Sequence, residues 1–141
     1  SQTGHTERMA AAVADGVRAV EGAEVVLKWA PEADLGDLLA ADGIAFGTPE
    51  NFGTMAGLKD FFDRTYVGAE GKMFRKPYAL FVSAGNDGTG AVRAVERIAL
   101  GFKFRKVYEA VICRGEVTEE VLEKCRELGG VLAAGCAMGI Y

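Results

Sequence analysis

Short apolar segments alternate with helical patterns along this chain, and this alternation limits the folds that are open to it. Residues 43–47 (GIAFG) and 77–83 (PYALFVS) are almost wholly apolar, as expected of strands that are buried on both faces of a parallel sheet. An amphipathic pattern follows each of them. The order of elements therefore predicts a three-layer, doubly wound α/β fold with right-handed crossovers.

The remaining elements are predicted from periodicity and from breaker residues. Apolar residues at steps of three and four predict a first helix that ends near Gly22, and similar stripes predict helices over residues 54–66 and about 92–102. A terminal helix is expected to start at Thr118. Residues 23–29 (AEVVLKW) and 107–113 (VYEAVIC) are predicted to be strands, with a short helical connection over 34–41.

Composition narrows the class of protein. The chain has 141 residues, of which 50% are hydrophobic, and a net charge of −4. This size predicts a single domain over residues 1–141. The mild, scattered charge argues against a nucleic-acid partner. Without an apolar run of about 20 residues or a signal-peptide pattern, we expect no membrane partner and a cytoplasmic location.

Cysteine and histidine give no sign of a metal site. The cysteines, Cys113, Cys125 and Cys136, are odd in number, widely spaced and without a C-x-x-C pair. We predict that they are reduced and largely buried. One histidine, His5, cannot build a histidine metal site, so no metal is expected.

Three polar, glycine-containing segments are expected at one edge of the sheet. They are residues 1–6 (SQTGHT), 48–53 (TPENFG) and 83–90 (SAGNDGTG). The second and third follow predicted strands, and the first precedes the first helix. Ligands of doubly wound sheets bind at the carboxyl ends of the strands, so a ligand site is predicted where these loops meet.

The first of these loops has the features of an anion site. A helix that starts at its end offers unpaired N–H groups and a partial positive charge, to which Thr3 and Thr6 add hydroxyl donors. Gly4 permits a close backbone approach. The alternative is that Thr3 or Thr6 merely caps the helix. Neither a Walker loop nor G-x-G-x-x-G is present, and the loop lacks the cysteine nucleophile of a phosphatase.

All three loops resemble one known family. S-Q-T-G-H-T resembles the (S/T)-x-T-G-x-T phosphate loop of the flavodoxin-like FMN-binding proteins. Residues 47–64 (GTPENFGTMAGLKDFFDR) resemble a stretch of the same family, including its quinone reductases of the tryptophan-repressor-binding-protein type. SAGNDGTG is similar to the family's glycine-rich loop beside the flavin ring. The resemblance covers essentially the whole chain and implies FMN as the cofactor and the strand order 2-1-3-4-5.

The resemblance also implies which residues bind FMN and leaves no side chain with a catalytic role. The phosphate would be held by Ser1, Gln2, Thr3, Gly4, His5 and Thr6, with His5 contributing its backbone N–H. The ribityl chain and ring would contact Thr48, Pro49, Glu50, Asn51, Phe52 and Gly53, and the far side would be closed by Ser83, Ala84, Gly85, Asn86, Asp87, Gly88 and Gly90. Two alternatives stay open: Phe52 as a core residue, and Asn86 with Asp87 as a simple turn.

One departure from the family pattern concerns the start of the chain. Family members have an apolar strand directly before the phosphate loop, and nothing precedes Ser1 in the printed sequence. That strand is central in the fold, and its five or so aliphatic side chains would contribute about 7 to 15 kcal/mol. We therefore expect an upstream strand in the full polypeptide. A strand donated by another chain is the alternative.

Two functions follow from the resemblance. The first is an FMN-dependent oxidoreductase that passes electrons from NAD(P)H to a quinone or similar acceptor, and the second is a flavodoxin-type electron carrier that docks on redox partner proteins. Carriers are usually strongly acidic around the flavin, so the mild charge and basic clusters such as 72–76 favour the enzyme. The short connection over 67–76 resembles a short-chain flavodoxin and keeps the carrier open. A flavin-free interaction module is a third interpretation, and no oligomeric state is predicted.

Overall fold

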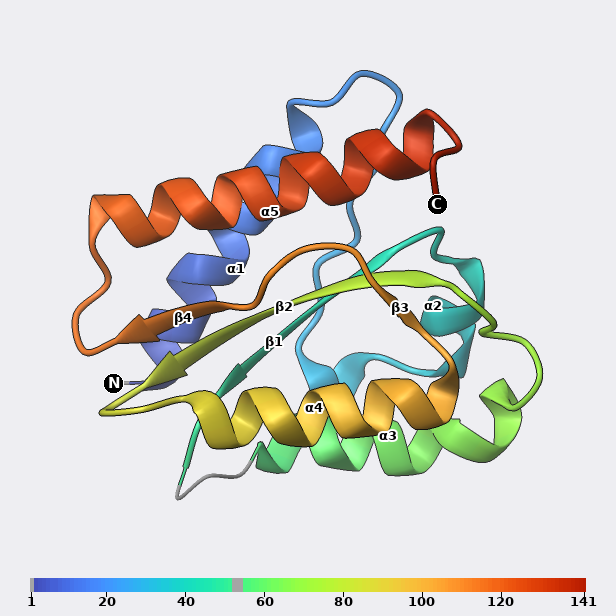
Figure 1. Cartoon of the computed structure of the whole chain (residues 1–141), viewed down its shortest axis with the longest axis horizontal. Coiled ribbons are helices and arrows are strands. Elements are labelled where there is room, and N and C mark those ends of the chain that lie inside the picture. The colour runs from blue at the N-terminus through green and yellow to red at the C-terminus, as the bar shows by residue number, and fades with distance from the viewer. Residues whose placement is uncertain (1, 52–54) are drawn as a thin grey trace.

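The fold is an α/β arrangement with a parallel sheet between helices, as the computed structural model shows for residues 2–51 and 55–141 (Figure 1). The helices are α1 (Gln2–Arg18), α2 (Leu35–Ala40), α3 (Ala56–Ala69), α4 (Thr89–Phe102) and α5 (Glu119–Ala137), with a 3-10 turn at Ala30–Glu32. The strands are β1 (Ile44–Pro49), β2 (Pro77–Ala84), β3 (Arg105–Lys106) and β4 (Val111–Arg114).

Strand β2 is the middle of the sheet. It pairs in parallel with β1 on one side and with β3 and β4 on the other. Each of its eight residues is buried, which explains why its sequence is almost wholly apolar, with Ser83 as the exception, rather than alternating. The predicted doubly wound α/β class is confirmed.

Helices cover both faces of this sheet (Figure 1). Helices α1 and α5 enclose one core, which includes Met9, Phe81 and Leu128. Helices α2, α3 and α4 lie over the other face, where Phe46 packs edge-on against Phe62 with ring centroids 5.1 Å apart. The sheet is therefore held between two separate hydrophobic layers.

The contact between α1 and α5 depends on glycine. A Cβ atom at Gly16 would overlap the carbonyl oxygen of Arg126, and one at Gly129 would overlap the carbonyl oxygen of Val13. Backbone atoms cannot move aside as a flexible side chain can, so these two glycines allow the helices to approach closely.

Two strand predictions were wrong. Residues 23–29 form no strand, because no neighbouring strand lies beside them in the described part of the chain, and Val26 and Leu27 are 73% and 55% exposed. Residues 107–110 of the predicted last strand, 107–113, form no strand. They connect β3, which ends at Lys106, to β4, which begins at Val111. The first helix ends at Arg18, four residues before the predicted end near Gly22. Gly22 itself has a positive φ of 84°.

The cysteine prediction is confirmed for the described chain. All three thiols are free, with Cys113 and Cys125 buried and Cys136 half-buried. Burial, with a smaller effect of neighbouring Cys113, raises the pKa of Cys125 to about 12. This thiol therefore stays protonated over the physiological pH range.

Candidate functional site at the carboxyl edge of the sheet

The three predicted loops lie at one edge of the molecule. In Figure 1 the start of α1, marked N, lies beside the arrowheads of β2 and β4. The segment after β1 leaves the same edge, because β1 runs parallel to β2 with Pro49 opposite Ser83. We call this edge the rim; it comprises residues 2–8, 48–51, 83–91 and 114–120.

Buried hydroxyls join α1 to the sheet at the rim. Thr6 is 7% exposed, Ser83 is fully buried, and their side-chain oxygens lie 2.6 Å apart. Ser83 is the second-last residue of β2, so this hydrogen bond fixes the first turns of α1 over the central strand. Two predicted site residues, 77 positions apart in the sequence, are thus brought together.

The first predicted loop is helical in the structure. Residues 2–6 already belong to α1, whereas we expected a loop that ends where the helix begins. The first N–H groups of a helix have no acceptor within the helix itself, and this property of a helix start is the one on which the prediction of a phosphate site rests. Ser1 lies outside the described residues, and Thr6 is a buried contact rather than a helix cap.

The second loop is tied closely to the third. The hydroxyl of Thr48 is buried and donates to the carbonyl of Pro49 at 2.8 Å, and the backbone N–H of Glu50 donates to the carbonyl of Ser83 at 2.8 Å. Asn51 is exposed. Phe52 and Gly53, two more predicted site residues, lie outside the described residues.

The carboxylate of Glu50 points at the start of α4. It accepts from the N–H of Gly88 at 3.0 Å and from the N–H of Ala91 at 2.9 Å. Gly88 is the N-cap position of α4 and has a positive φ of 87°. Glu50 therefore fulfils the role that a capping side chain would have if Gly88 carried one.

The third loop is partly exposed and is held by residues that the sequence analysis did not single out. Ser83 and Ala84 are buried, while Gly85, Asn86 and Asp87 are exposed. Arg114 Nε donates to the carbonyl of Asp87 at 2.8 Å, and the Thr89 hydroxyl donates to the Asp87 carboxylate at 2.5 Å. Arg114 ends the last strand, and its position at a carboxyl end was the signal that could have identified it.

Three other helices have their first turns capped by residues of this chain. Asp34 and Asp37 form a capping box at α2, Glu50 caps α4, and Thr118 accepts from Val121 N–H at α5. Helix α1, by contrast, has no acidic residue in its first turn. As far as the structure describes them, the first turns of α1 and α3 both lack an acidic residue, so an anionic group such as the phosphate of FMN is compatible with the start of α1.

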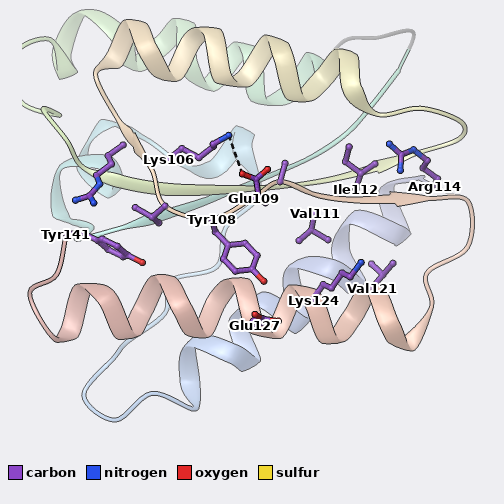
Figure 2. A pocket seen from close by; sticks show the side chains of 13 residues that line it. Lys106, Tyr108, Glu109, Val111, Ile112, Arg114, Val121, Lys124, Glu127 and Tyr141 are labelled. Atoms are coloured by element: carbon purple, nitrogen blue, oxygen red, sulfur yellow. Dashed lines mark ion pairs between the residues drawn. The ribbon is translucent and has the colours of Figure 1, made fainter.

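A separate groove lies away from this site. Figure 2 shows it between α5 and the outer strand of the sheet, by which we mean the segment from β3 to β4. Its volume is about 940 Å³, and its walls include Tyr108, Glu127 and Tyr141. Lys106 forms ion pairs with Glu109 and Glu96 at its border. Of the residues that line it, Arg114 alone belongs to the rim, so the groove is not the predicted FMN site.

No helix in the described part of the chain has the length and apolar character needed to cross a membrane.

Comparison with known proteins places the chain in a family. The flavodoxin family model matches residues 1–129. A flavodoxin from Aquifex aeolicus is 36% identical over 98% of this chain and 84% of that protein. An NAD(P)H dehydrogenase (quinone) from Syntrophobacter fumaroxidans is 33% identical over 82% of this chain and 67% of that protein.

The fold comparison agrees. A solved flavodoxin from the domain Archaea superposes with a TM-score of 0.82 at 23% identity, over 97% of this chain and 94% of that one. The predicted family and its cofactor, FMN, are confirmed, whereas the individual FMN contacts stay predictions. The chain belongs to the flavodoxin family of FMN-binding electron-transfer proteins.

Proposed function

We propose that this protein is a flavodoxin-type electron carrier that docks its rim on redox partner proteins. FMN supplies the redox chemistry when it is bound, and the chain's residues hold and orient it. The observation that carries this proposal over the NAD(P)H-dependent enzyme is the separation of charge between the two ends of the sheet. We also propose that residues 1–141 form one domain and act in the cytoplasm.

Acidic side chains gather at the rim. Exposed carboxylates come from α1, from the loop after β2 and from the loop and first turn that follow β4: Glu7, Asp87, Glu116, Glu119 and Glu120. Arg8 and Arg114 are the exposed cations there within the described residues. With five carboxylates against two arginines the rim is acidic, and Arg126 and Lys124 of α5 pair with Glu119 and Glu120.

Cations gather at the opposite end of the sheet. The turn before β2 and the entry into β3 carry Lys72, Arg75, Lys76, Lys103, Arg105 and Lys106. Two backbone hydrogen bonds join these segments, from Arg75 N–H to the Lys103 carbonyl at 2.7 Å and from Arg105 N–H to the Lys76 carbonyl at 2.9 Å. The basic cluster that favoured the enzyme in the sequence therefore lies away from the rim.

Such a charge distribution steers association. An acidic surface around the site of electron transfer raises the encounter rate with a basic partner and orients it, and salt weakens the effect. The positive end would face away from such a partner. The buried hydrogen bond of Thr6 and the partly buried hydrogen bonds of Glu50 would keep the loops that border the cofactor in place during docking.

Stopped-flow kinetics tests this proposal. FMN-loaded protein is reduced chemically and mixed with cytochrome c as a basic acceptor at salt concentrations from about 20 to about 500 mM. We expect the second-order rate constant to fall by about tenfold or more over this range. A rate independent of salt would contradict docking through the acidic rim.

The second candidate is the NAD(P)H:quinone oxidoreductase, favoured by the 33% identical quinone dehydrogenase. The same FMN-loaded protein is mixed anaerobically with NADH or NADPH, with no reductase present. A carrier is reduced slowly or not at all. Rapid bleaching of the flavin band, followed by turnover with a soluble quinone, would establish the enzyme instead.

A further inference from the structure

We infer that Glu50 is a positioning residue: its carboxylate caps α4 from another loop and holds together the two segments that are expected to border the flavin. This inference rests on the proposed FMN site at the rim. It assigns to Glu50 contacts with the protein backbone in place of the flavin contact that the family resemblance implied.

Helix α4 cannot cap itself. Its N-cap residue is Gly88, which has no side chain and makes no capping bond of its own. The N–H of Ala91, at the third helical position, is the usual donor to a capping side chain. Here that N–H donates to Glu50 at 2.9 Å, although Glu50 lies 41 positions earlier in the chain.

Glu50 makes three bonds to the same segment. Its carboxylate accepts from Gly88 and Ala91, and its own N–H donates to the Ser83 carbonyl. The loop after β1 is therefore fastened to the loop after β2 at both ends, at Ser83 and at Ala91. Removing the carboxylate would release the α4 end and leave the Ser83 end in place.

The negative charge also has a consequence for ligand selection. A carboxylate on the first turn of α4 neutralises the partial positive charge of that helix end. An anionic group of a ligand is therefore disfavoured at the start of α4, which agrees with the predicted phosphate site at the first turn of α1. Glu50 would thus contribute to the orientation of FMN without contacting its phosphate.

The test uses four forms of the protein: wild type, Glu50→Gln, Glu50→Ala and the control Thr118→Ala. Thr118 caps α5 at the same rim, but its bond stays within its own helix end. Amide hydrogen exchange is measured on the FMN-free proteins, and FMN affinity is measured separately by quenching of flavin fluorescence.

We expect Glu50→Ala to speed exchange of the Gly88 and Ala91 amides and to raise the FMN dissociation constant by about tenfold, the scale of a lost cap. Glu50→Gln retains one accepting oxygen, so it should protect one of the two amides and lose about threefold in affinity. Thr118→Ala should leave both measurements within about twofold of wild type. If Glu50→Ala does not fold, the result for Glu50→Gln decides.

Two results would overturn the inference. Unchanged exchange of both amides in the variants would show that Glu50 does not cap α4. Weaker FMN binding with unchanged exchange would show that Glu50 contacts FMN directly. A wild-type protein that binds no FMN would instead refute the proposed function, and the exchange data on the FMN-free protein would still decide the role of Glu50.

Discussion

The hydroxyls of Thr6 and Ser83 form a buried hydrogen bond of 2.6 Å that fastens the first turns of α1 to the central strand. Thr6→Val and Ser83→Ala each remove this hydrogen bond, so each should lower the free energy of unfolding by about 0.5 to 1.5 kcal/mol.

The double variant removes both hydroxyls and should cost less than the sum of the two single changes, by about 0.5 kcal/mol or more. Urea unfolding of the FMN-free proteins measures this difference. Strict additivity would mean that the two hydroxyls contribute independently.

Adjacent glycines in α5 should respond oppositely to the same substitution. Gly129→Ala would place a Cβ on the Val13 carbonyl and force α1 and α5 apart, so it should cost about 1 to 3 kcal/mol or more. At Gly130 the nearest atom to such a Cβ is the Gly16 carbonyl oxygen at 3.6 Å, an ordinary contact.

Gly130→Ala should therefore be neutral or stabilise the protein by up to about 1 kcal/mol, because alanine favours the helix. Thermal unfolding of both variants provides the comparison. Equal losses at the two positions would argue against close α1–α5 packing as the cause.

Alkaline pH should destabilise the protein. Burial, aided by Glu96, raises the pKa of Tyr78 to about 12, and burial also raises the pKa of Cys125 to about 12. Above the ordinary pKa values the unfolded chain loses these protons while the folded chain keeps them, so stability falls as pH rises toward 12. Each group contributes at most about 1.4 kcal/mol per pH unit.

The variant Tyr78→Phe retains the ring and removes the ionisable hydroxyl. Its melting temperature should fall less steeply than that of wild type between about pH 10 and 11.5. Identical slopes would mean that Tyr78 does not contribute to the alkaline transition.

Reversing one charge at each end of the sheet tests the acidic rim. Glu116 is exposed at the rim, and Lys103 is exposed at the opposite end. Glu116→Lys should slow electron transfer to cytochrome c at low salt by about threefold or more, because it weakens steering. Lys103→Glu should leave this rate within about twofold of wild type. A larger effect at Lys103 would move the docking surface to the opposite end.

Sequence patterns predicted those parts of the fold in which the apolar pattern of a segment is enough to show which of its residues are buried. Strand β2 is apolar except for Ser83 and is buried throughout, so its pattern and its structure agree. Residues 23–29 (AEVVLKW) also have a strand-like composition, with two adjacent valines, but no strand lies beside them in the described chain. A strand is stable only when it pairs with a neighbouring strand, and the composition of a segment does not show whether such a neighbour is present.

The rim was located by the rule for parallel sheets, whereas its internal bonds were not foreseeable. The bond between Glu50 and Ala91 joins residues 41 positions apart, and no local pattern encodes it. Gly88 at the N-cap of α4 was a partial signal. A glycine has no side chain that could accept from the first N–H groups of the helix, so the acceptor has to come from another segment. The bond from Arg114 to Asp87 depends in the same way on β4 ending beside the third loop.

The interruption of the outer strand bears on self-association. On β2, Tyr78 pairs with Lys106 and Phe81 pairs with Val111. Three residues along β2 therefore correspond to five along the outer strand, so the outer strand carries two extra residues between these pairs. Charged Lys106 borders this irregular stretch and Glu109 lies within it. Another chain cannot extend a regular hydrogen-bond ladder along such an edge. The irregularity thus protects this edge of the sheet from amyloid-like, edge-to-edge aggregation.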